Sequence, residues 1–332
     1  DKPVAEESAQ SSPLTTAAWL PKSLVASAVL TAVLFFALAV IAMFLSRRTG
    51  DIAMLWYANA AVVALLQAKP KTQWPVLLGA TAFGNIAANG LFGDAGLLSL
   101  SFTVGNVIEI SIAAMLLRRY CAPADCVNRP GSLSLALLLG GVVPAFFGAT
   151  LGASLLYALG VGPIDRVWLS WFEGSSIGSV ALLPLGLLLT ARGWRPLWLD
   201  LRRASVLLAL LLVVGISLTA PTALPHPYVY ISIALVLVAS VGRFAGAALG
   251  VLLCSLSVAV LIAQGVFQPL MTIHSLNESL FYLPLMLVLL PPLLLGATLE
   301  RIHHGVGELA QREDDFRNLY EKAPVMMHSV GI

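Results

Sequence analysis

The sequence predicts an all-α fold, a polytopic transmembrane helical bundle of about eight to ten spans that continues into a C-terminal signalling helix. Of the residues, 58% are hydrophobic and 11% are charged, whereas about a quarter of a soluble domain is charged. The apolar residues gather in long stretches without the two-residue alternation of a membrane barrel strand. Because a helix satisfies its own backbone hydrogen bonds in lipid, we expect these stretches to be helices.

About ten apolar stretches can be separated along the chain. A helix needs about 20 apolar residues to cross the hydrocarbon core, and shorter ones cross when they are packed or the bilayer thins. The expected spans are 24–45, 52–68, 74–91, 97–117, 133–159, 167–190, 204–218, 228–241, 245–263 and 280–299. The eighth is short, and it could pair with the ninth as one bent unit hinged at Gly242 and Arg243. Charged or turn-forming residues at the joints support this division.

The distribution of Lys and Arg predicts the orientation, because cytoplasmic loops carry an excess of both. With both termini in the cytoplasm, the outer joints hold Arg47, Arg48 and Arg166. The inner joints then hold Lys69, Lys71, Arg118, Arg119, Arg129, Arg192, Arg195, Arg202, Arg203 and Arg243. These basic residues are spread over many joints and form no single patch, so no nucleic-acid partner is expected.

The chain divides into four segments by composition. Residues 1–21 are rich in Ser, Ala, Glu and Pro and are expected to be disordered. Residues 22–300 are expected to form the membrane domain and 301–316 a linker helix, while the separate segment 317–332 rests on a resemblance given below. The three cysteines, Cys121, Cys126 and Cys254, make no disulfide framework, and we expect neither a metal nor a cofactor.

Several motifs carry a resemblance to a known family. They are residues 55–60, 74–80, 84–85, 105–109, 116–119, 241–247, Trp168, Trp171, Gly174, Gly178 and residues 183–185. Their order and spacing over residues 24–301 resemble the bacterial membrane-associated sensor domain of the first type. That family precedes diguanylate cyclases, cyclic-di-GMP phosphodiesterases and histidine kinases. The resemblance implies a multi-pass protein of the bacterial inner membrane.

Residues 311–324 resemble the opening of a PAS domain. This resemblance implies that residues 317–332 are the truncated start of that domain, and that the chain is the front end of a longer signalling protein. The sequence contains no Ser-His-Asp set and no nucleotide-binding loop. We therefore expect no enzymatic activity from this segment, and the full-length protein is expected to carry the output.

Glu109 and Glu173 are predicted to lie inside the bilayer. At mid-bilayer a charge costs about 2.5–3.5 kcal/mol on insertion scales. One interpretation is a ligand or ion site, or a protonation switch. The other is a carboxyl group that Asn, Ser or Trp donors hold across a helix interface without a ligand. Because isolating one charge is costly, we expect both acids in one polar site, with Asn85 and Asn106 nearby.

Asn85, Asn89 and Asn106 place amides at a similar depth. Asn85 and Asn89 are four residues apart, and Asn106 and Glu109 are three apart, so each pair shares a helix face. The amides could be interhelical hydrogen-bonding groups, worth about 0.6 kcal/mol each, or could line a polar pocket. Trp171 lies near the outer end of the sixth span, as part of an interfacial aromatic belt or as the wall of a ligand site.

A heptad pattern runs out of the last span, with apolar or aromatic residues at alternating steps of four and three. Its members are Leu295, Leu299, Ile302, Val306, Leu309, Phe316 and Tyr320, with Glu313 at the one missing place. This pattern predicts a parallel homodimer. The other expected partners are the lipid bilayer and an unknown small-molecule or lipid-soluble cue.

These observations favour a sensory input domain that detects a cue and regulates a cytoplasmic output through a dimeric linker helix. A membrane transporter or permease for a small solute is the alternative, because buried acids and interrupted helices suit transport as well. A third hypothesis is an anchor that only dimerises its output domain.

Overall fold

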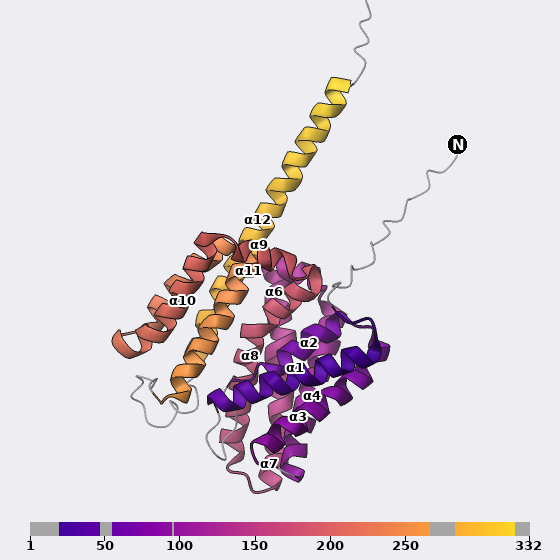
Figure 1. Cartoon of the computed structure of the whole chain (residues 1–332), viewed down its shortest axis with the longest axis vertical. Coiled ribbons are helices and arrows are strands. Elements are labelled where there is room, and N and C mark those ends of the chain that lie inside the picture. Colours follow the sequence, from indigo (N-terminus) through magenta and orange to yellow (C-terminus); the bar gives the residue numbers. More distant parts are fainter. Residues whose placement is uncertain (1–19, 47–54, 95, 266–282, 323–332) are drawn as a thin grey trace, which may run out of the picture.

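The computed structural model describes residues 20–46, 55–94, 96–265 and 283–322, and in this part every regular element is a helix (Figure 1). In order they are α1 Leu24–Ser46, α2 Ala58–Gln67, η1 Lys71–Gln73, α3 Trp74–Leu91, α4 Leu97–Tyr120, α5 Pro123–Asn128, α6 Pro130–Leu137, η2 Leu138–Val142, α7 Val143–Ala158, α8 Ile164–Arg192, α9 Arg195–Leu201, α10 Ala204–Ala223, α11 Pro227–Ala263 and α12 Leu283–Lys322. The predicted all-α class is confirmed. The expected disorder of residues 1–21 falls almost entirely outside the described residues.

Seven helical stretches in the described part are long and apolar enough to cross a membrane. They are α1, α4, the continuous run from α6 through η2 to α7, α8, α10, α11 and α12. The chain is therefore a multi-pass membrane protein. α3 coincides with the third expected span but is not one of these seven, because Asn and Gly residues interrupt its apolar sequence.

α11 is two helices joined by a sharp turn. Arg243 has φ 50° and ψ −139°, a conformation that breaks the helix. The second half folds back on the first, since a Cβ atom added to Gly250 would lie 2.6 Å from Val238 and 3.7 Å from Leu235. The two halves match the eighth and ninth expected spans. The turn lies at Arg243, within the hinge that the sequence suggested at Gly242 and Arg243. A non-glycine residue held in this region costs about 1–3 kcal/mol.

α2 is shorter than the second expected span, for which the sequence predicts a helix over 52–68. The helix begins only at Ala58, and its 10 residues cover about 15 Å, half of a bilayer core. Leu55, Trp56 and Tyr57 precede it as buried non-helical backbone. Such backbone is tolerated at membrane depth only where protein surrounds it, so the surrounding helices must supply its partners.

α8 and α11 supply those partners. The backbone N–H of Trp56 donates to the carbonyl of Gly174 on α8 at 3.1 Å. A Cβ atom on Gly178 would lie 1.9 Å from the Trp56 carbonyl oxygen, so only glycine allows this approach. On the other side, the Tyr57 hydroxyl shares a 2.8 Å hydrogen bond with Ser255 on α11. The irregular segment is thus fixed between two long helices.

The fifth expected span, 133–159, is one helical run with a π-helical segment in its middle. η2 brings Gly140 close to Leu117 of α4 and Leu183 of α8, and brings Gly141 close to Ser179 of α8. A π segment inserts a residue into a helical turn and shifts the faces on either side of it. This shift lets the same run pack against both α4 and α8.

The helices form two groups with α8 between them (Figure 1). α10, α11 and α12 pack together, whereas α1, α2, α3, α4 and α7 form the other group. α8 packs against α2 and α7 of one group and against α11 and α12 of the other. The C-terminal part of α12 projects beyond the bundle, and each of residues 301–318 is exposed.

Several chain segments meet at the start of α1. The Lys69 ammonium group, beyond the end of α2, donates to the Pro21 carbonyl and to Ser27 at 2.8 Å. Burial among these neutral oxygens lowers its pKa below the usual value for lysine. Arg118, near the end of α4, donates to the carbonyl oxygen of Lys69. The start of α1 and the ends of α2 and α4 therefore lie together.

We expect Gly178→Ala to destabilise the protein by about 1–3 kcal/mol, the usual cost of overpacking. The added methyl group would collide with the Trp56 carbonyl, which the Trp56–Gly174 hydrogen bond holds in place. Fluorescence-detected thermal unfolding in lipid nanodiscs measures the effect. The control is Gly79→Ala on α3, where an added Cβ meets nothing within 4 Å. Equal unfolding temperatures in the two variants would contradict the packing described here.

Candidate functional site

A buried polar cluster lies between α2, α4 and α8. The Glu109 carboxylate accepts hydrogen bonds from the Trp171 indole at 3.2 Å and from the Ser175 hydroxyl at 3.1 Å. Asn59 lies beside Glu109, and its side-chain amide donates to the side-chain oxygen of Asn106 at 3.1 Å. We call these five residues the Glu109 centre. It unites three of the residues expected from the sequence, namely Glu109, Asn106 and Trp171.

Local helix geometry positions the members of the Glu109 centre. Asn106 and Glu109 are three residues apart on α4, and Trp171 and Ser175 are four apart on α8, so each pair shares one helix face. Asn59 lies in the first turn of α2, and the Trp56 indole donates to its side-chain oxygen Oδ1 at 2.9 Å. The non-helical segment before α2 thus aims Asn59 at the other two helices.

Three glycines make room for the Glu109 centre. A Cβ atom on Gly148 of α7 would lie 2.6 Å from the Glu109 carboxylate, and one on Gly152 would lie 2.5 Å from the Trp171 ring. Gly105 of α4 is equally close to that ring, at 2.7 Å. Any larger residue would push the carboxylate or the indole out of place. α7 therefore packs closely against both side chains, because it presents glycines to them.

The Glu109 carboxylate is buried, with 2% of the residue exposed, and has no ion-pair partner among the described residues. Its hydrogen bonds come from neutral donors. An uncompensated acid at this depth is costly, and such acids in membrane proteins often serve a function. Chemically, the group can hold a proton, bind a cation or accept a hydrogen bond from a polar ligand.

Glu173 lies outside the Glu109 centre. It follows Trp171 by two residues, and therefore projects about 200° around α8 from the face that carries Trp171 and Ser175. It is also buried, at 9% exposed, and one of its carboxylate oxygens has no hydrogen-bond partner in the described part of the chain. The structure therefore does not bring the two acids together, because α8 separates them.

Asn85 and Asn89 form a separate pair on α3. The Asn89 side-chain amide donates to the side-chain oxygen Oδ1 of Asn85 at 3.1 Å, and both side chains are buried. No hydrogen bond among the described residues connects this pair to Glu109. α3 packs against α1 and α4, so the pair lies at a helix interface away from α8.

Sequence reasoning missed Asn59, Ser175, Gly148 and Gly152. Asn59 lies within the motif of residues 55–60, and the small-residue spacing of Gly148 and Gly152 is typical of close helix packing. The sequence therefore indicates that these residues matter for packing. It does not indicate that they meet at Glu109, because the contacts come from four different helices.

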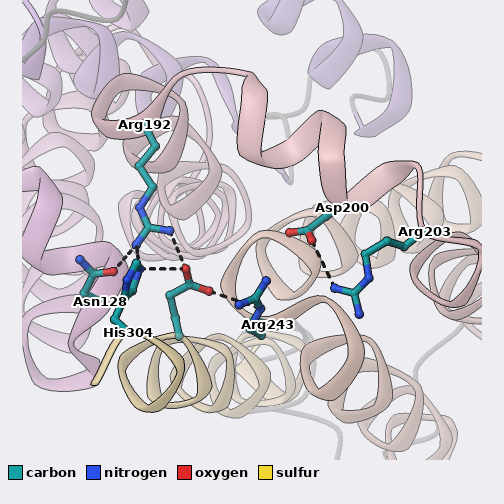
Figure 2. A network of polar contacts seen from close by, with 7 residues as sticks. Asn128, Arg192, Asp200, Arg203, Arg243 and His304 are labelled. Atoms are coloured by element: carbon teal, nitrogen blue, oxygen red, sulfur yellow. Dashed lines mark hydrogen bonds and ion pairs between the residues drawn. The ribbon is translucent and has the colours of Figure 1, made fainter. Parts of the chain in front are cut away.

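A second polar cluster joins four helices where α12 leaves the bundle (Figure 2). Glu300 of α12 pairs with Arg192 of α8 at 2.6 Å and with Arg243 of the α11 turn at 3.9 Å. His304 lies one turn further along α12, 3.4 Å from Glu300. Arg192 also donates to Asn128 of α5. We call these five residues the Glu300 network; the sequence had suggested only an orientation role for its two arginines.

Comparisons with known proteins agree with this architecture. The family profile MASE1 matches residues 27–302, which confirms the resemblance seen in the sequence. The chain is 27% identical over 293 residues to the probable diguanylate cyclase DgcE of Escherichia coli K12, covering 86% of this chain and 26% of that protein. The chain thus spans about a quarter of this relative's length. No solved structure matches.

We expect Trp171→Phe to lower the free energy of unfolding by about 1–2 kcal/mol, because it leaves the buried Glu109 carboxylate with one donor fewer. Trp168→Phe is the matched control, since the indole of Trp168 donates to Thr150 at an exposed position. Its cost should be only a few tenths of a kcal/mol. Thermal unfolding in nanodiscs compares the two variants, and a larger loss for Trp168→Phe would contradict the role given to Glu109.

Proposed function

Because the chain belongs to the MASE1 family, we propose that it is the sensory input domain of an inner-membrane signalling protein, and that it regulates cyclic-di-GMP synthesis in the cytoplasm. The similar E. coli protein is a probable diguanylate cyclase, which supports this output. The cyclase activity is proposed for the full-length protein, of which the described residues form the sensory part. The Glu109 centre is the proposed site where the cue acts.

One observation carries this proposal: α8 is a member of both polar clusters. Ser175, in the first half of α8, binds Glu109, and Arg192, the last residue of α8, binds Glu300. The two residues are 17 positions apart along the helix, which corresponds to about 26 Å. Pro184 lies between the two sites and removes one backbone hydrogen bond, so the helix can bend there. A change at the Glu109 centre can thus reach α12.

We place both termini in the cytoplasm. The Glu300 network gathers two of the arginines that the sequence assigned to inner joints, and α12 leaves the bundle beside them. Lys69 and Arg118, also assigned to inner joints, lie together at the start of α1. These groupings support the excess of positive charge on the cytoplasmic side.

We further propose that α12 forms a parallel homodimer. Ile302, Val306, Leu309 and Phe316 follow the heptad pattern and are 56–74% exposed in the single chain. A row of large apolar residues on a projecting helix needs a partner to exclude water. The helix runs unbroken to Lys322, past residue 316, where the linker was expected to end.

A transporter remains the alternative, favoured by one observation. Non-helical backbone at Leu55–Tyr57 next to a buried acid is typical of transporter binding sites. The projecting α12 favours signalling instead, because transport does not require it. Uptake assays that give the same result with and without the chain would exclude the transporter.

Glu109→Gln keeps the shape of the side chain and removes its charge, and should change cellular cyclic-di-GMP several-fold if the Glu109 centre sets the output. Mass spectrometry of extracts from cells that carry the full-length protein measures this. Asp165→Asn, at the exposed start of α8, is the control. If Glu109→Gln inserts normally and gives the parental level, Glu109 has a structural role and the anchor hypothesis gains support.

Insertions after Leu309 test how α12 passes the signal on. Seven residues keep the heptad seam in phase, whereas two residues rotate it by about 200°. We expect the seven-residue variant to retain regulated cyclic-di-GMP synthesis and the two-residue variant to lose it. Equal output from both variants would indicate a flexible tether.

A further inference from the structure

Glu300 occupies a special position on α12, because it is the last buried residue before the helix leaves the bundle. Only 8% of it is exposed, whereas each of residues 301–318 is exposed. Its carboxylate faces cations from α8 and from the α11 turn. The exit point of the projecting helix is therefore fixed by charge as well as by packing.

The Glu300 network holds more positive than negative charge. Arg192 and Arg243 both pair with Glu300, and neither has another acidic partner among the described residues. The nearby Asp200 pairs with Arg203 instead, at 3.4 Å (Figure 2). Without the Glu300 charge, two guanidinium groups would face each other across the exit of α12. Their repulsion would oppose the docking of α12 between α8 and α11.

The α12 backbone contacts the α11 turn one helical turn before Glu300. A Cβ atom on Gly296 would lie 2.9 Å from the Arg243 carbonyl oxygen and 3.1 Å from the Phe244 Cα. The same Arg243 has the left-handed φ of 50°. Two contacts on one face of α12, Gly296 and Glu300, thus hold a strained turn in place.

We propose that the Glu300 network is a latch that holds α12 against α8 and the α11 turn, and that the sensor changes its output by loosening this latch. The proposal rests on the function proposed above, because it makes α12 the output helix. A bend of α8 at Pro184 displaces Arg192. Loss of that ion pair frees α12 to rotate or slide, and the strained turn at Arg243 relaxes as its contacts weaken.

Hydrogen–deuterium exchange of the full-length protein in nanodiscs tests the latch directly. Glu300→Gln should speed amide exchange about tenfold in peptides that cover the α11 turn and residues 293–304. Glu308→Gln, on the exposed part of the same helix, is the matched control and should leave exchange unchanged. Parental exchange in Glu300→Gln would overturn the latch, whatever the output enzyme does.

A double variant separates the charge effect from a loss of folding. Arg192→Gln combined with Glu300→Gln leaves Arg243 as the only charged group of the three, so the net charge returns to the parental value, and the two new amides can bond to each other. It should return exchange toward the parental rate, while a purely structural defect would become worse. If Glu300→Gln does not fold, Arg243→Gln, which leaves the Arg192–Glu300 pair in place, should show the faster exchange at the α11 turn; parental exchange there would overturn the latch.

The output measurement distinguishes the latch from the function on which it rests. If Glu300→Gln speeds exchange and shifts cyclic-di-GMP several-fold while Glu308→Gln does neither, the latch controls signalling. Faster exchange with an unchanged cyclic-di-GMP level, in a protein whose parent makes this product, would overturn the control role. A parent that makes no cyclic-di-GMP would refute the proposed output, and the exchange rates would still decide whether the latch exists.

Discussion

The hydrogen bond from the Trp56 amide to the Gly174 carbonyl is the interaction on which the rest of the bundle depends. It satisfies a backbone donor of a non-helical segment at membrane depth, where water is absent. Gly178 permits the approach, since any side chain there would meet the Trp56 carbonyl. With this segment fixed, α2 begins at Ala58 and Asn59 reaches Glu109. The polar site therefore depends on a break in a helix.

α8 organises the molecule because it contacts both groups of helices. One of its faces holds the Glu109 centre, its far end holds Arg192, and Glu173 lies on the opposite side. Buried polar groups in lipid are stable only with partners, and most of these partners lie on other helices. A shift of α8 therefore disturbs several hydrogen bonds at once. This coupling would carry the signal that we propose through an otherwise apolar bundle.

The two polar clusters differ in their electrostatics. Glu109 has neutral donors around it, so its charge is uncompensated among the described residues, and its state can respond to a ligand, a cation or a proton. Glu300 has an excess of cations around it and is held as an anion. In the function we propose, the cue acts at the first cluster, and the second cluster attaches α12 to the bundle. The projecting helix carries an exposed apolar row, which the homodimer we propose would cover.

The sequence by itself determined the fold class, most of the helices and the hinge at Gly242 and Arg243, because long apolar stretches and breaks between them are local properties. It also identified Glu109, Asn106 and Trp171. Only the tertiary structure decided that Leu55–Tyr57 is not helical and that Glu173 is apart from Glu109. Both outcomes depend on contacts between distant segments: a carbonyl of α8 that receives the Trp56 amide, and the rotation of α8 that turns Glu173 away. No periodicity within one helix records which neighbour will face it.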